Sequence, residues 1–180
     1  DEQFQVRLEK LDRLRTRGID PYPPRFRRTH NALEATSLFQ EEERTSGPQA
    51  RIQAVSVAGR IFTMRRMGGA TFMDLRDGSG RLQLYLRRDS LGERYDLLKE
   101  LDLGDFLGAS GPLFRTRTGE ITLEAQDFQV LAKALRPLPE KWHGLVDVEK
   151  RYRQRYLDLL ANQEVLQVFH TRSRVVDSIR

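Results

Sequence analysis

The stretch Thr71-Phe-Met-Asp-Leu-Arg-Asp-Gly-Ser-Gly-Arg-Leu-Gln-Leu-Tyr-Leu86 holds two runs of alternating apolar and polar residues around a turn. Successive side chains of a strand point to opposite faces, so the apolar members of both runs share one face. These inward-facing residues are Met73, Leu75, Leu82, Leu84 and Leu86. The turn, Asp77-Gly-Ser-Gly80, can supply the positive φ angles of a tight hairpin. The sequence therefore predicts a hairpin of strands 71–76 and 81–86 with one buried face.

The opposite face of the predicted hairpin presents aromatic and amide groups. Phe72, Gln83 and Tyr85 lie there, outside the core. The charged residues expected on the same face are Asp74, Arg76, Arg81 and Arg87. Bases stack on aromatic rings for roughly 1–3 kcal/mol each, and amides can hydrogen-bond base edges. In the alternative, structural interpretation, Phe72 packs under a loop or the first helix and Gln83 is merely solvated. The pattern alone does not decide between base binding and this structural interpretation.

Further strands surround this hairpin in the sequence. Period-two patterning predicts a long first strand over 52–67 and later strands over 105–114 and 120–131, the last two joined by a hairpin at 115–119. Helical spacing of Leu91, Tyr95, Leu98 and Leu101 predicts a helix over 91–101. The order strand, strand, strand, helix, strand, strand is that of an OB-fold, a five-stranded barrel whose second and third strands commonly bind single-stranded nucleic acid.

The segments on both sides of the barrel read as helical. Leu8, Leu11 and Leu14 recur at helical spacing before Gly18, a proline-rich connector follows, and a second helix over 29–44 should bury Leu33, Leu38 and Phe39. We expect an N-terminal helical extension at 1–50, the barrel at 51–134 and a linker at 135–162. A last helix at 163–180 has an apolar face without a partner, which indicates a chain cut within a longer protein.

Composition narrows the classes of function. The 180 residues are 38% hydrophobic and 32% charged, and no apolar run approaches the roughly 20 residues that cross a bilayer. There is no secretory leader and no cysteine, which favours the cytoplasm. The three histidines lie far apart in sequence, so neither a metal centre nor a catalytic site is expected in this chain.

The net charge of +5 is concentrated in one segment. Between Arg60 and Arg88 there are seven arginines against two aspartates, an excess equal to that of the whole chain. Guanidinium groups pair with phosphate and stack on bases, which suits contact with RNA. A bias toward arginine codons would explain the overall number of arginines equally well, but not their clustering.

Several motifs resemble those of the class II lysyl-tRNA synthetases, in their N-terminal anticodon-binding region. The shorter ones are Ala58-Gly-Arg-Ile, Arg65-Arg-Met-Gly, Leu103-Gly-Asp-Phe-Leu-Gly108 and Thr116-Arg-Thr-Gly-Glu120. The most specific are Lys133-Ala-Leu-Arg-Pro-Leu-Pro-Glu-Lys-Trp-His-Gly144 and Arg151-Tyr-Arg-Gln-Arg-Tyr-Leu-Asp-Leu159. Together they cover nearly the whole chain. The aspartyl and asparaginyl relatives, which share the barrel, differ in the last two blocks.

The resemblance implies four residues that contact the anticodon of tRNA(Lys). The central uracil would stack on Phe72, with Gln83 and Arg66 near its polar edge, and Glu120 would lie near the wobble base. A phosphate clamp is an equally good reading of Arg66, and a solvated hairpin residue is the alternative for Glu120. Trp142 and His143 fall in the family's junction segment, so no chemical role is assigned to them.

The resemblance also implies what this chain lacks. Activation of lysine with ATP and Mg2+, and its transfer to tRNA, belong to a catalytic domain of the full-length protein, which is expected to dimerise through that domain. The helix at 163–180 resembles the start of that domain, so this piece should bind tRNA without aminoacylating it, and no cofactor is expected on it. Two rival hypotheses are a non-enzymatic OB-fold module that binds single strands with little sequence preference and a synthetase paralogue.

Overall fold

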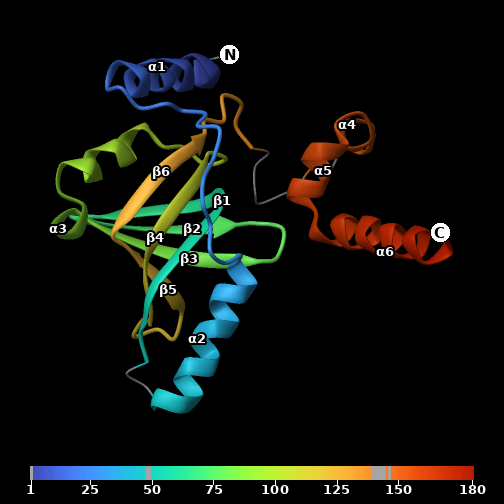
Figure 1. The fold of residues 1–180 in the computed structure, drawn as a ribbon. Coiled ribbons are helices and arrows are strands. Elements are labelled where there is room, and N and C mark those ends of the chain that lie inside the picture. The colour runs from blue at the N-terminus through green and yellow to red at the C-terminus, as the bar shows by residue number, and fades with distance from the viewer. Residues whose placement is uncertain (1, 48–49, 139–144, 146) are drawn as a thin grey trace. The chain divides into compact units, whose positions relative to one another are not determined.

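The computed structural model describes residues 2–47, 50–138, 145 and 147–180 (Figure 1). The chain divides into two compact units, Asp1–Pro137 and Leu138–Arg180. The first unit holds a barrel and two N-terminal helices. The second holds helices alone in its described part.

The described residues form one six-stranded sheet that closes on itself. Its strands are β1 (Ile52–Met67), β2 (Ala70–Arg76), β3 (Arg81–Arg87), β4 (Phe106–Arg115), β5 (Ile121–Ala125) and β6 (Asp127–Ala132). The order is β1-β2-β3-β5-β4-β6, and an additional pairing of β1 with β4 closes the ring. β3 and β5 run parallel, and the other pairs are antiparallel. The prediction of a mainly β, OB-fold barrel with flanking helices is confirmed.

The barrel is filled from the predicted inward faces of its strands. Met73, Leu84 and Leu86 are fully buried, and Leu75 and Leu82 are nearly so. Leu107, Leu113 and Leu123 complete the core from β4 and β5. The alternation read from the hairpin sequence therefore assigned its core face correctly.

The strand predicted over 120–131 is interrupted at Gln126. Leu113 of β4 pairs with Leu123 of β5, but Ser110 pairs with Asp127 of β6, so the second strand advances by one extra residue. This is the signature of a β-bulge, which bends a strand and strengthens its twist. The bend lets one continuous segment follow the curved edge of β4.

The helical segment after β3 is tighter than predicted. A short helix α3 (Arg88–Leu91) is followed by the 3₁₀ helix η2 (Gly92–Glu100) rather than by one α-helix over 91–101. Gly92 has a φ of +57°, which breaks the regular helix between the two. The predicted buried positions hold, because Tyr95 and Leu98 are buried. The hydroxyls of Tyr95 and Thr71 lie 2.8 Å apart inside the barrel end.

The second helix, α2 (Ala32–Ser46), begins three residues later and ends two residues later than the predicted 29–44, and it buries a different side. Asn31 caps its start: the Asn31 side chain accepts a hydrogen bond from the Glu34 amide, and the Glu34 carboxylate accepts one from the Asn31 amide. Phe39 is buried, but Leu33 is 59% exposed and Leu38 is 37% exposed, so that part of the prediction was wrong. The small residues Ala32 and Ala35 face the barrel instead, because the chain approaches it closely there.

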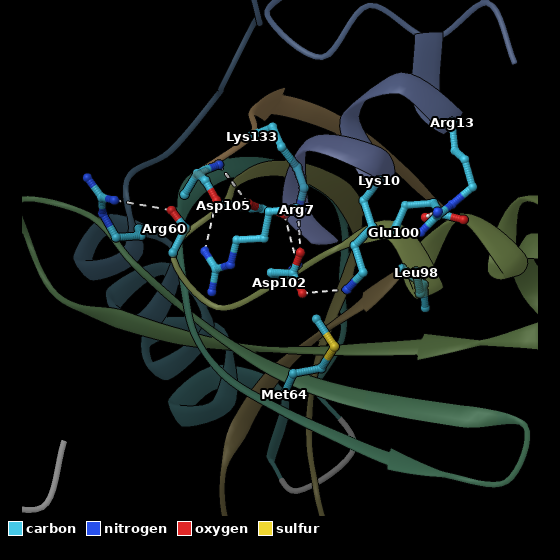
Figure 2. Close-up of polar contacts among 12 residues, drawn as sticks. Arg7, Lys10, Arg13, Arg60, Met64, Leu98, Glu100, Asp102, Asp105 and Lys133 are labelled. Carbon is cyan, nitrogen blue, oxygen red and sulfur yellow. Dashed lines mark hydrogen bonds and ion pairs between the residues drawn. The ribbon is translucent and has the colours of Figure 1, made fainter. Parts of the chain in front are cut away.

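Helix α1 (Glu2–Thr16) is held to the barrel by charged groups (Figure 2). Lys133 has a fully buried side chain and its Nζ lies 2.7 Å from Asp105 and 2.5 Å from Asp102. Lys10 of α1 reaches the other oxygen of Asp102 at 2.5 Å. Arg13 of α1 lies 2.9 Å from a carboxylate oxygen of Glu100, at the end of η2. These pairs form an ionic cluster that joins α1 to the start of β4 and the end of β6.

The backbone that leaves β6 is also held from the N-terminal side. Arg7 of α1 donates to the carbonyl oxygen of Ala134 at 2.8 Å and to that of Arg136 at 3.4 Å. The Tyr22 hydroxyl donates to the carbonyl oxygen of Lys133 at 2.9 Å. The segment after the barrel therefore has its direction fixed by residues more than 100 positions earlier.

The second unit contains α4 (Val148–Arg153), α5 (Arg155–Ala161) and α6 (Gln163–Ile179). A break at Gln154 separates α4 from α5. Asp158 is buried and accepts hydrogen bonds from Arg151 and Arg155, so one buried carboxylate links α4 to α5. The expectation that Trp142 and His143 carry no chemistry concerns positions outside the described residues. Within the described residues, no helix combines the length and apolar character needed to span a membrane.

Candidate nucleic-acid interface

An aromatic row crosses the outer face of the barrel. Arg65 of β1 pairs with Phe72 of β2, Phe72 with Tyr85 of β3, and Tyr85 with Glu124 of β5. The Phe72 and Tyr85 rings are stacked, with centroids 4.6 Å apart and planes 24° from parallel. Phe114 of β4 extends the group, tilted 57° from Tyr85 at 6.2 Å. Phe72 and Tyr85 are both partly exposed, so their outer surfaces form an aromatic platform.

A polar row lies next to the aromatic row, two residues away on each strand. It consists of Thr63, Asp74, Gln83 and Thr122, contributed by β1, β2, β3 and β5. Thr63 Oγ1 donates to Asp74 Oδ2 at 2.6 Å. Thr122 Oγ1 donates to Gln83 Oε1 at 2.9 Å. Low exposure and these bonds hold the four side chains in a defined arrangement.

A charged row borders the polar row on its far side. Arg81 lies with one guanidinium nitrogen 3.3 Å from Asp74 Oδ1 and forms a close ion pair with Glu120 through another. The neighbouring Arg76 places its guanidinium carbon 4.4 Å from the centre of the Phe62 ring. Glu120, which directly precedes β5, is therefore on the same side of the sheet as Gln83 and is paired with Arg81.

Phe72 lies where the sequence predicted it, but Gln83 is less exposed than expected. Only 7% of Gln83 is accessible, because it sits between Asp74 on one neighbouring strand and Thr122 on the other. It is on the outer face as predicted, but it is neither free nor merely solvated. A buried amide of this kind offers its hydrogen bonds in a fixed direction.

Arg66 does not share a face with Phe72 and Gln83. Its register partner is Thr71, which is fully buried beneath η2, and its Nη2 donates to the Leu98 carbonyl oxygen at 2.7 Å. Arg65 pairs directly with Phe72, so its guanidinium group is on the same face as the aromatic platform. The Arg65 side chain is exposed and has no hydrogen bond or ion pair among the described residues. The two-residue turn Gly68-Gly69 could have revealed this, since a symmetrical hairpin around it pairs residue 65 with residue 72.

Two more arginines lie at the β5 end of the aromatic row. Arg51 Nη2 is 2.6 Å from Glu124 Oε2, and Arg87 Nε is 3.6 Å from Glu124 Oε1. Both arginine side chains remain about half exposed. One acidic group therefore neutralises two basic ones only in part, and Arg65, at the other end of the row, faces no acidic partner in the part of the chain that the structure describes. The platform is rimmed by positive charge, as a surface for an RNA backbone requires.

In the described part of the chain, no group of three or more histidine, cysteine, aspartate or glutamate side chains is arranged to hold a metal ion. The interface consists of the three rows described above: aromatic, polar and charged. Such a surface can stack a base, read the polar groups on its edge and contact its phosphates.

Comparison with known proteins agrees with this geometry. Residues 55–131 match the family of OB-fold nucleic acid binding domains. The whole chain is also similar to curated lysine–tRNA ligases. It is 53% identical to that of Dehalococcoides mccartyi over 97% of this chain, 50% identical to that of Pelotomaculum thermopropionicum over 100%, and 45% identical to that of Bacillus subtilis over 100%. This chain spans about a third of the length of these relatives, 35%, 34% and 36% respectively.

Proposed function

We propose that this chain, whose residues 55–131 are an OB-fold nucleic acid binding domain, recognises the anticodon of tRNA(Lys) as the N-terminal part of a lysine–tRNA ligase. The observation that carries the proposal is the stacked Phe72–Tyr85 platform beside the ordered amide of Gln83. Single-stranded bases bind OB-folds by stacking on such rings, and polar side chains beside the rings supply selectivity.

Each row of the interface has a role in this proposal. The central uracil of the anticodon stacks on Phe72, and Gln83 hydrogen-bonds its polar edge. Arg65 takes the guanidinium role that the family resemblance had assigned to Arg66, because Arg65 is the one beside Phe72. Glu120, with its partner Arg81, contacts the wobble base next to it. A wrong base leaves a polar group unpaired at a cost of about 1–3 kcal/mol.

The chemistry of the ligase belongs, in this proposal, to parts of the protein beyond these 180 residues. ATP and Mg2+ would be bound there, lysine would be activated there, and the homodimer would form through the catalytic domain. We also propose a cytoplasmic location, where tRNA is charged. The present chain contributes tRNA selection, and the relatives that it matches at about a third of their length are ligases by name.

The test is binding of the 180-residue chain to an anticodon stem-loop RNA with a U-U-U anticodon. Phe72→Ala should weaken binding about tenfold or more, since stacking of one base is worth about 1–3 kcal/mol. Phe106→Ala is the matched control, because Phe106 is a partly exposed ring on β4 outside the three rows. Arg65→Ala should weaken binding several-fold, whereas Arg66→Ala should change it less than about twofold. Salt must be fixed throughout, because phosphate contacts make affinity depend on it.

The alternatives predict different results in the same assay. A non-enzymatic single-strand module would bind U-rich and C-rich loops with equal affinity, and a paralogue without tRNA recognition would bind both weakly. If Phe72→Ala binds as tightly as the parent while circular dichroism shows an intact fold, the platform is not the base-binding surface.

A further inference from the structure

The Gln83 amide is oriented by a buried hydroxyl. Thr122 is completely buried on β5, and its Oγ1 donates to Gln83 Oε1 at 2.9 Å. A weaker contact of the same hydroxyl, 3.2 Å, runs to the Glu120 carbonyl oxygen. Because a hydroxyl carries one proton, the shorter bond defines the main acceptor. The carbonyl end of the amide is thus committed to the protein.

The other end of the amide is free to meet a ligand. Gln83 Nε2 has no hydrogen-bond partner among the residues that the structure describes, and it is not among their buried unpartnered atoms. An amide carries its two N–H donors at that end. Gln83 therefore presents donors, and not an acceptor, next to the Phe72 platform.

The opposite neighbour in the polar row does not compete for these donors. Asp74 Oδ2 accepts from Thr63 at 2.6 Å, and Asp74 Oδ1 faces Arg81 at 3.3 Å. Both carboxylate oxygens thus have partners on β1 and β3. Among the described residues, the Gln83 amide is thus left with one fixed anchor, the Thr122 hydroxyl.

We propose that Thr122 is a positioning residue that sets the base preference of this site by turning the N–H donors of Gln83 toward the ligand. Donors at this point pair with the carbonyl at carbon 4 of uracil and meet the amino group of cytosine there as donor against donor. Without the hydroxyl, the amide can turn over and offer its carbonyl to cytosine. The inference rests on the proposed function and adds to it the residue that makes Gln83 selective.

The experiment measures a ratio of affinities rather than one affinity. Stem-loop RNAs with U-U-U and U-C-U anticodons differ at the central base only, so stacking and phosphate contacts cancel. We expect the parent to prefer uracil by about tenfold, which corresponds to one unpaired polar group. Thr122→Ser keeps the hydroxyl and should retain the ratio within about twofold. Thr122→Val keeps the branched shape without the hydroxyl, and its ratio should fall toward one.

A structural role alone would predict a different pattern. Loss of fold in Thr122→Val would weaken the binding of both RNAs equally, so thermal unfolding of each variant is measured in parallel. Gln83→Glu provides a second variant, because its carboxylate still accepts from Thr122 but has no N–H to offer. It should lose the preference for uracil while Phe72 still provides stacking.

The outcomes separate the two proposals. A parent that shows no preference between the two loops overturns the proposed function and the inference with it. A parent that prefers uracil, with Thr122→Val keeping the full ratio, overturns the inference and leaves anticodon recognition standing. If Thr122→Val does not fold, retention of the preference by Gln83→Glu overturns the inference in its place.

Discussion

Removal of Lys133 should strongly destabilise the barrel, because this residue neutralises carboxylates in the protein interior. Its side chain is fully buried, as is that of Asp105, and Nζ lies 2.7 Å from Asp105 Oδ2. Lys133→Met keeps an unbranched apolar side chain but leaves Asp105 without its cation. Removing one partner of a buried ion pair typically costs about 3–5 kcal/mol.

The remaining contacts of the cluster place the expected loss at the lower end of that range. Asp105 still accepts hydrogen bonds from the amides of Asp102 and Ala134, each at 2.8 Å. Asp102 keeps its ion pair with Lys10. We therefore expect a loss of about 3 kcal/mol in the free energy of unfolding, a large part of the roughly 5–15 kcal/mol that stabilises a typical domain.

Urea unfolding followed by far-ultraviolet circular dichroism measures this loss. With a slope of about 2 kcal/mol per molar urea, the midpoint should fall by about 1.5 M. Lys99→Met is the matched control, since Lys99 is 68% exposed and pairs with Asp96 on the surface. It should cost less than about 1 kcal/mol.

A double variant separates loss of charge pairing from loss of packing. Asp105→Asn in the Lys133→Met background removes the unpaired charge and should recover part of the stability, and it keeps the comparison available if the single variant fails to fold. The reasoning is refuted if Lys133→Met costs no more than Lys99→Met, or if the double variant is less stable than Lys133→Met.

Two further predictions concern the same unit. Burial tends to raise the pKa of Asp102, but hydrogen bonds from Lys10 and Lys133 outweigh it and lower the pKa below its ordinary value. Its contribution to stability is thus complete above the ordinary aspartate pKa of about 3.9 and is lost as the pH falls through the lower folded-state value; urea midpoints at pH 6 and pH 3 should differ less in Asp102→Asn than in the parent. Gly111→Ala would place a Cβ 1.9 Å from the Glu124 carbonyl oxygen, so we expect a loss of about 1–3 kcal/mol in urea unfolding, whereas Gly78→Ala, with no atom within 4 Å, should unfold like the parent. Equal midpoints for the two glycine variants would contradict the close approach of β4 and β5.

The core face of the β2–β3 hairpin could be predicted from the sequence because its apolar residues recur at every second position. Met73 and Leu84 were assigned to the core by period two alone, and both are fully buried. The bulge at Gln126 could not be predicted in this way, since it arises where one segment follows the curvature of β4. Exposure of Leu33 likewise depends on how closely α2 approaches the barrel.

The candidate site was predictable in its position but not in its detail. Phe72 and Gln83 were placed on the outer face by alternation, and the structure finds them there. The choice between Arg65 and Arg66 depended on register across the Gly68-Gly69 turn, because a shift of one residue reverses the face. The role of Thr122 could not be read from the local pattern, since it reaches Gln83 from a strand 39 residues further along the chain.

The hydrogen bonds from Arg7 and Tyr22 to three backbone carbonyls after β6 affect the conformational entropy of that segment. A segment held only by the last strand residue can adopt many backbone conformations, and ordering each of its residues costs about 1–2 kcal/mol in conformational entropy. Here Lys133, Ala134 and Arg136 are already bound by the N-terminal segment. This entropy cost is therefore met when the first unit folds, and the backbone at Lys133, Ala134 and Arg136 is already ordered as part of that unit.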